Sequence, residues 1–293
     1  MSSSTRPGRR EALIVACALL AGAALLFWPL WTHQRHLVPF HVLVGDPALE
    51  GLDAAADRPD WRTYDLAPVT VTYAEKALFA RGLRQGELAL WNPYSGLGLP
   101  LLADAQSQPL APLFWPFLVL PSPWVYSACL VLNLLFAGLG MDRFLQKLGV
   151  GIQGRLAGSL LAAFNPFTLK YLAYSNCWAY AWLPWLFLAA AGMREKAGAA
   201  WILGALSALA GMSGHPEEAL MGSAAAFAFG VIGRSQAGGF GGRRWVHCLA
   251  APLVALLLSA WWLLPFFEWA AHSESVRLHG FRPVSYGWSS PFL

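Results

Sequence analysis

Charge is the scarcest property of this sequence. Only 12% of its 293 residues are Asp, Glu, Lys or Arg, about half of the roughly 25% found in soluble domains. Hydrophobic residues make up 57% of the chain, and 15 residues are Trp. This composition disfavours an ordinary soluble enzyme and indicates a chain built for a lipid bilayer. The formal net charge of +4 is small and dispersed, so nucleic acid is not an expected partner.

Two further absences narrow the classes of function. The four cysteines, at positions 17, 129, 177 and 248, share no C-x-x-C or metal-ligand spacing. They lie in or beside apolar runs, so we interpret them as apolar packing residues. The glycine-rich stretch QAGGFGG, residues 236–242, follows no strand pattern and is typical of a flexible linker rather than a phosphate-binding loop. Soluble nucleotide-dependent enzymes are therefore disfavoured.

The N-terminus predicts a membrane anchor. Residues 12–31 form an apolar run preceded by Arg6, Arg9 and Arg10. A run of about 20 residues is long enough to cross roughly 30 Å of hydrocarbon as a helix. The apolar region of a cleavable signal peptide is shorter, about 7–15 residues. We expect residues 1–11 to be cytoplasmic and residues 12–31 to be the first transmembrane helix.

Six more apolar runs predict the rest of the architecture, at residues 122–141, 154–172, 177–193, 198–213, 218–233 and 246–268. Several are short or broken by Pro and Gly, and one or two of them could be re-entrant. We predict an all-α polytopic membrane protein with about seven spans. Residues 32–121 then form a long first loop, residues 122–268 the remaining bundle, and residues 269–293 a tail.

The Lys and Arg distribution orients this arrangement. With a cytoplasmic N-terminus, the inner connections carry eight basic residues: Arg143, Lys147, Arg155, Arg194, Lys196, Arg234, Arg243 and Arg244. The long first loop carries charges of both signs, but long loops cross the membrane largely regardless of charge. The short outer turns hold only Lys170 before the last span. By the positive-inside rule, the long first loop and the tail lie outside the cytoplasm.

The first loop contains a helical pattern. Val71, Ala74, Leu78 and Leu83 recur at helical spacing, with charged residues between them. This pattern predicts an amphipathic helix that lies on the membrane surface. A helix that only packs on the bundle is an equally weighted alternative. The segment PLAPLFWPFLVLP, residues 109–121, is expected to be re-entrant.

Two motifs carry a resemblance to a known family. Residues 86–100 follow the pattern G-x-L-x-L-W-N-P-Y-x-G-x-G-x-P, after an Asp and a Pro at Asp65 and Pro68, and MSGHPEEAL occupies residues 212–220. Over the whole chain, the sequence resembles the YfhO-like bacterial membrane proteins, relatives of the GT-C glycosyltransferases. The resemblance implies a multi-pass protein of the bacterial cytoplasmic membrane. Because such proteins are much longer, it also implies that this chain is an N-terminal piece.

The resemblance further implies a reaction and a catalytic residue. GT-C enzymes transfer a sugar from a polyprenyl phosphate to an acceptor at the outer face, with an acidic residue in the first loop that matches Asp65 here. An Asp can take the proton of the attacking hydroxyl, while a cation or hydrogen-bond donors steady the departing phosphate. The need for a divalent cation stays open. The alternative is that Asp65 caps the following helix.

Other outer residues are candidates for binding the sugar, its lipid phosphate or membrane lipid: Trp91, Asn92, Tyr94, Asp104, Gln106, Lys170 and His215. Pro93 and Pro100 fix the turn that carries Trp91 and Tyr94, so we expect a shaped wall at the interface. Alternatives are an elaborate loop without a ligand, polar groups that satisfy the backbone of a bend, and a Lys170 that only snorkels.

His215 precedes two acids, Glu217 and Glu218. A His with acidic neighbours can ligate a metal, or bind phosphate when protonated. Because adjacent helical side chains point about 100° apart, we expect at most one Glu to face the same partner as His215. Capping of the next helix is the alternative, and the sequence defines no metal site.

The sequence therefore predicts a membrane glycosyltransferase of GT-C type that uses a polyprenyl-phosphate-linked sugar and an acceptor in the cell envelope. The alternative is a non-catalytic membrane protein, either a lipid or polysaccharide transporter or an assembly subunit. A transporter would show ionisable residues within its spans and an internal repeat, and neither is clear here. The oligomeric state stays open.

Overall fold

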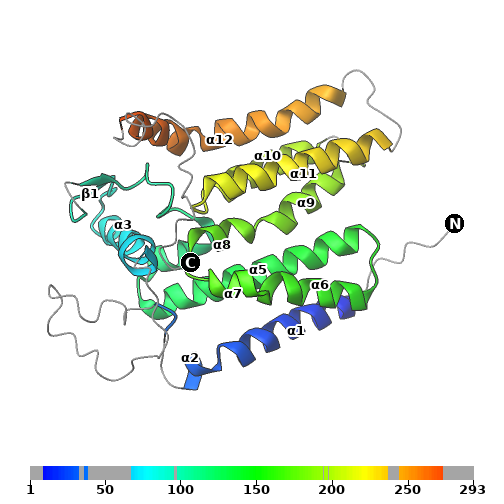
Figure 1. Cartoon of the computed structure of the whole chain (residues 1–293), viewed down its shortest axis with the longest axis horizontal. Helices are drawn as coiled ribbons and strands as arrows, with labels where there is room; N and C mark the ends of the chain where they lie inside the picture. Colours follow the sequence, from blue (N-terminus) through cyan, green and yellow to red (C-terminus); the bar gives the residue numbers. More distant parts are fainter. Residues whose placement is uncertain are drawn as a thin grey trace, which may run out of the picture.

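The computed structural model describes residues 9–32, 36–38, 67–95, 98–193, 195–196, 198–236 and 244–272, and these are mostly helical. The long helices lie side by side, and the short elements between α2 and α5 lie at one end of them (Figure 1). The bundle consists of α1 (Arg9–Leu26), α5 (Pro123–Lys147), α6 (Ile152–Phe164), α9 (Leu183–Gly192), α10 (Ala199–Gly211), α11 (Pro216–Gln236) and α12 (Arg244–His272).

We call the end that carries the short elements the loop end; it includes residues 67–122, 165–175 and 212–215. The short elements are α2 (Trp28–Thr32), a π-helix (Pro68–Tyr73), α3 (Ala74–Arg84), β1 (Trp91–Asn92), β2 (Leu99–Pro100), a 3-10 turn (Pro112–Phe114), α4 (Trp115–Val119), α7 (Pro166–Lys170) and α8 (Ser175–Tyr180). The two short strands add a small antiparallel hairpin to the expected all-helical fold.

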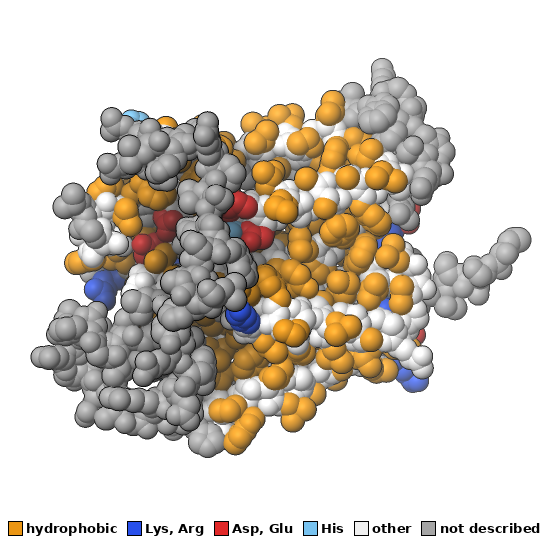
Figure 2. Space-filling view, in the orientation of Figure 1, with side chains coloured by type: hydrophobic (Ala, Val, Ile, Leu, Met, Phe, Trp, Pro, Cys, Tyr) orange, Lys and Arg blue, Asp and Glu red, His pale blue; other side chains and the backbone are white. Residues whose placement is uncertain are grey.

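Two of the described helices are long and apolar enough to cross a membrane: Pro123–Lys147 and the Cys248–His272 part of α12. The side of the bundle seen in Figure 2 is largely hydrophobic. Length and composition thus support association with a membrane. By contrast, α6, α9 and α10 have only 13, 10 and 13 residues, fewer than the roughly 20 that span a bilayer. The count of seven spans stays a prediction.

Local sequence signals explain where these helices begin and end. The Ser122 hydroxyl accepts from the Val125 amide at 3.3 Å, and Pro123 takes the first position of α5. Asn165 and Pro166 do the same at α7, where Asn165 Oδ1 accepts from the Thr168 amide at 3.1 Å. The expected run 154–172 is therefore divided into α6 and α7.

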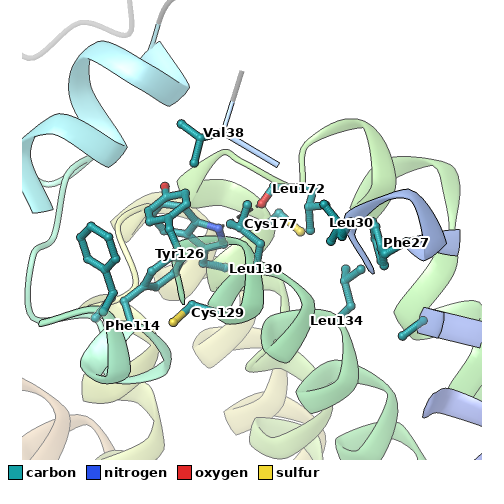
Figure 3. Packing of buried hydrophobic residues seen from close by; sticks show 14 of the residues in the cluster. Phe27, Leu30, Val38, Phe114, Tyr126, Cys129, Leu130, Leu134, Leu172 and Cys177 are labelled. Carbon is teal, nitrogen blue, oxygen red and sulfur yellow. Dashed lines mark hydrogen bonds between the residues drawn. The ribbon is translucent and has the colours of Figure 1, made fainter. Parts of the chain in front are cut away.

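Small residues let the bundle helices approach closely. A side chain at Gly138 in α5 would meet Leu19 of α1 and the Ser159 carbonyl oxygen of α6, and one at Gly204 in α10 would meet the Ala251 carbonyl oxygen of α12. The main apolar cluster joins the end of α1, α5 and the loop end (Figure 3): it includes Phe27, Leu30, Val38, Phe114, Tyr126, Cys129, Leu130, Leu134, Leu172 and Cys177. None of the four cysteines forms a disulfide, and all except Cys17 are buried.

The end away from the loop end gathers several of the basic residues expected on one side. Lys147 Nζ lies 2.7 Å from a carboxylate oxygen of Glu195, and Arg155 Nη1 lies 2.8 Å from a carboxylate oxygen of Glu11. One expectation is corrected here: Arg155 is a buried residue of α6 and not an exposed loop charge, because it also pairs with the buried Asp142 of α5.

The orientation of α3 also corrects an expectation. The residues predicted to form its apolar face include Ala74 and Leu83, which are exposed, whereas Glu75 and Lys76 are buried. The prediction assumed one continuous helical period from Val71 onward. Residues Pro68–Tyr73 instead form a π-helix, whose wider turn shifts the phase of the following residues. The buried face of the helix thus combines two charged side chains with Phe79 and Ala80.

Candidate functional site

The candidate site is a buried polar cluster between α3 and residues 101–111. Glu75 is 3% exposed and Lys76 is fully buried. Charged side chains are almost never fully buried unless they are paired. Because the two residues are adjacent on the first turn of α3, both reach the same neighbouring loop.

The ammonium of Lys76 is held by carbonyl oxygens and aromatic rings. It donates to the carbonyl oxygens of Ser107 and Gln108, the latter at 3.0 Å. It also lies 5.1 Å from the ring centre of Phe114 and 4.6 Å from that of Trp178, distances that suit cation–π attraction. Burial lowers the pKa of Lys76 to about 7, against the opposing effect of nearby carboxylates. Lys76 thus fixes the loop backbone from inside.

Glu75 faces a second acid. Its Oε1 accepts from the Asn92 side-chain amide at 3.3 Å, whereas its Oε2 is buried and has no hydrogen-bond partner among the described residues. Burial, and next the negative charge of Asp104, raise the pKa of Glu75 to about 7. A carboxyl group with a pKa near neutrality is suited to exchange a proton.

Asp104 is held by its own loop. Its two carboxylate oxygens accept from the backbone amides of Gln106 at 3.1 Å and Ser107 at 3.2 Å. This turn presents the carboxylate to Glu75 and leaves the Gln106 side chain exposed. Asp104 and Asn92, both predicted to bind substrate, therefore meet at Glu75.

The hairpin separates its residues onto two faces. In the register Trp91 opposite Pro100 and Asn92 opposite Leu99, Trp91 is 54% exposed while Asn92 is buried. Gly98, with φ of +103°, lies directly against the Trp91 indole, where any side chain would clash. Tyr94 is 80% exposed. The described residues of the hairpin thus present aromatic rings outward and an amide inward.

The His215 turn packs against the same loop. Gly214, with φ of +102°, has no room for a side chain because Ser175 and the Gln106 carbonyl oxygen lie against it. Acidic side chains and a histidine gather at this end of the bundle (Figure 2). The His215 turn, more than 100 positions later in the sequence, thus packs beside residues 101–111.

Both acids of this turn face His215, which corrects the expectation that only one would. His215 Nδ1 lies 3.1 Å from a carboxylate oxygen of Glu217, and it also contacts Glu218. His215 precedes the helix, so its ring lies over the first turn and both acids can reach it. Burial lowers the pKa of His215, partly offset by Glu217. One ligand atom from each residue lies within 4.8 Å of the others, so the group could hold a metal ion.

The other predicted site residues do not join this cluster in the described part of the chain. Asp65 lies outside the described residues. Lys170 is exposed at the end of α7, with its ammonium 5.2 Å from the ring centre of Tyr171. Sequence reasoning missed Glu75 and Lys76, which it assigned to the polar side of a surface helix. Adjacent acidic and basic residues beside a proline-led helix start were the available signal, but hydropathy cannot reveal the π-helix.

A pocket of about 210 Å³ opens far from this cluster, at the other end of the bundle, and is lined by Glu11, Gln146, Arg155 and the turn that joins α5 to α6. The Arg155 guanidinium is already neutralised there by Glu11 and Asp142. It therefore offers little free charge to an anionic ligand.

The buried carboxyl group of Glu75 beside the half-buried Asp104 is the chemically distinctive feature of this cluster. A paired, partly proton-bearing acid group at one end of an apolar bundle can accept or release a proton, or bind the hydroxyl groups of a polar molecule. Comparison of the chain with family models, curated proteins and solved structures finds no match.

Proposed function

We propose that the chain is a membrane glycosyltransferase of GT-C type, which transfers a sugar from a polyprenyl phosphate to an acceptor in the cell envelope. In this proposal the chain spans the bacterial cytoplasmic membrane about seven times. The N-terminus is cytoplasmic, and the loop end faces outward. The observation that carries the proposal is the buried Glu75 beside the half-buried Asp104 at the loop end.

The carboxylates lie at the level of the membrane where a polyprenyl-phosphate sugar would place its reacting carbon. A polyprenyl-phosphate sugar keeps its chain in the bilayer and its phosphate at the headgroup level, so the reacting carbon lies near the ends of the helices. The acceptor oxygen forms its bond to the sugar as the bond from the sugar to the phosphate oxygen breaks, and that electron pair stays on the phosphate. The acceptor proton goes to a carboxylate. Asp65 is the predicted base, and Asp104 is the described carboxylate suited to assist it.

Other residues of the loop end have proposed roles in binding. The exposed Trp91 and Tyr94 rings are suited to stack on a sugar or to lie at the membrane interface. Asn92 holds Glu75, Gln106 is exposed for hydrogen bonding, and Lys170 is suited to meet a lipid phosphate. A divalent cation, where the reaction needs one, would be held by His215, Glu217 and Glu218.

One observation favours a non-catalytic membrane protein as a second candidate. Both carboxylate oxygens of Asp104 already accept backbone amides of their own loop, which is the pattern of a structural turn. In that case the cluster only holds the loop on α3.

The test is transfer of labelled hexose from a polyprenyl-phosphate donor by membranes that contain the protein. Replacement of a general base typically lowers the rate about 10²- to 10⁴-fold, so we expect such a loss for Asp65→Asn and a smaller loss for Asp104→Asn. Asp60→Asn, a nearby acid outside the motif, is the matched control. Near-native transfer by both Asp65→Asn and Asp104→Asn would remove the enzymatic proposal in favour of the structural one.

A further inference from the structure

The carboxyl group of Glu75 is poorly solvated in the folded protein. Its side chain is 3% exposed, and its Oε2 has no hydrogen-bond partner in the described part of the chain. A buried ionised carboxylate with an unpaired oxygen is costly, because neither water nor a donor replaces its lost hydration. The group must therefore gain a partner or lose its charge.

The groups that face Glu75 indicate which of these happens. Asp104 brings a second negative charge from the neighbouring loop, and Lys76 brings one positive charge from α3. The Lys76 ammonium is directed at the Ser107 and Gln108 carbonyl oxygens and at two aromatic rings, with the Cys129 thiol of α5 also nearby. Two carboxylates and one ammonium leave a net charge of −1, and one added proton makes the cluster neutral.

The two acids differ in how well they tolerate a charge. The two carboxylate oxygens of Asp104 each accept a hydrogen bond from a backbone amide. Glu75 lies deeper and accepts from the Asn92 side-chain amide, and although the Asn92 and Ser107 side chains lower its pKa, burial and Asp104 raise it by more. The added proton therefore belongs on Glu75.

We infer that Glu75 carries a proton on Oε2 in the folded protein and shares it with Asp104. The pair holds one proton in total, with Glu75 as the neutral donor and Asp104 as the ionised acceptor. Glu75 is then a positioning residue, because its O–H orients the Asp104 carboxylate. The shared proton does not depend on the proposed function. Only an effect of Glu75 on sugar transfer, through the Asp104 carboxylate, rests on it.

Infrared spectroscopy of the whole chain in nanodiscs tests the proton directly. A protonated carboxylic acid has a carbonyl stretching band that is separate from those of carboxylates and amides. At about pH 6, below the pKa that burial and Asp104 give Glu75, we expect such a band in the wild type. We expect Glu75→Gln to lose this band and Glu87→Gln, an exposed acid after the same helix, to retain it. A wild-type spectrum without the band, or a band that survives Glu75→Gln, overturns the inference.

Asp104→Asn and the pH dependence of stability provide a second measurement. Removal of the negative neighbour should shift the titration of the Glu75 band to lower pH, and an unshifted titration contradicts proton sharing. The pKa of Glu75 rises from 4.5 to about 7 on folding, so its contribution to stability is full below 4.5 and is lost as the pH rises through 7. Gln mimics the protonated acid, so Glu75→Gln should fold and lack this decline. If the stability of Glu75→Gln declines with pH as much as that of the wild type, the inference is refuted. The infrared band and the stability profile do not depend on sugar transfer, so a failure of the proposed function leaves both measurements unchanged.

Discussion

The ion pairs at the end away from the loop end allow a quantitative prediction for Asp142. Arg155 Nε and Nη2 lie 2.8 and 2.7 Å from Asp142 Oδ1, and Arg155 Nη1 lies 2.8 Å from Glu11 Oε2. The side chains of Arg155 and Asp142 are 2% and 1% exposed, whereas that of Glu11 is 40% exposed. The network connects α1, α5 and α6, but its two pairs lie in different surroundings.

Burial sets the expected magnitudes. Replacement of one partner of a buried pair typically costs about 3–5 kcal/mol. Because the Arg155 guanidinium keeps the half-exposed Glu11 carboxylate as a partner, Asp142→Asn should lower the free energy of unfolding by up to about that amount. Loss of the half-exposed pair should cost only about 0–1 kcal/mol, because water replaces the partner, so Glu11→Gln should have a small effect. Removal of both buried charges, in Arg155→Met with Asp142→Leu, should restore much of the loss.

Denaturant unfolding in detergent micelles, followed by circular dichroism, measures these differences. The order of the two single effects is the sensitive quantity, since Asp142→Asn and Glu11→Gln both keep the side-chain volume. If Glu11→Gln destabilises as much as Asp142→Asn, or if the double replacement is worse than Asp142→Asn, the assignment of the buried pair is wrong.

Three other variants test separate features. Gly98→Ala should destabilise the hairpin and change the Trp91 fluorescence, because its methyl group overlaps the indole; an unchanged spectrum contradicts that packing. The pKa of Lys76 falls from 10.5 to about 7 on folding, so wild-type stability should rise from pH 7 towards 10.5, and Lys76→Met should lack this slope; a retained slope assigns it to another group. After replacement of the native cysteines, a single cysteine at position 95 should react with an impermeant thiol reagent in intact cells and one at position 235 should not; the reverse pattern refutes the orientation.

The helical bundle was the most predictable part of the fold. Apolar run lengths are sufficient to locate a helix such as α5, because a long apolar run has few other stable arrangements. The division after α6 was also readable, since Asn165 and Pro166 form a favoured cap and first position. Hydropathy averages over such a pair, so the expected run continued through it.

The candidate site was less predictable, because its main residues are exceptions to the usual sorting of polar residues. Asn92, Asp104 and His215 could be selected from their residue types and their position in the loops. Glu75 and Lys76 could not, because charged residues at helical spacing ordinarily mark a solvated face. Their burial depends on a helical phase shift and on carbonyl oxygens supplied about 30 positions later.

The buried charged groups at the two ends of the bundle differ in their partners. Around Arg155, each buried charge has an ionised partner at hydrogen-bond distance, an arrangement that rigidifies three helices and leaves nothing free to react. At the loop end, Glu75 Oε2 has no hydrogen-bond partner among the residues that the structure describes, and the Lys76 ammonium is directed at carbonyl oxygens and aromatic rings. Groups left near neutrality in this way destabilise the fold at neutral pH relative to fully paired charges. Because such a cost is typical of a site that moves protons, reactivity is more to be expected at the loop end than around Arg155.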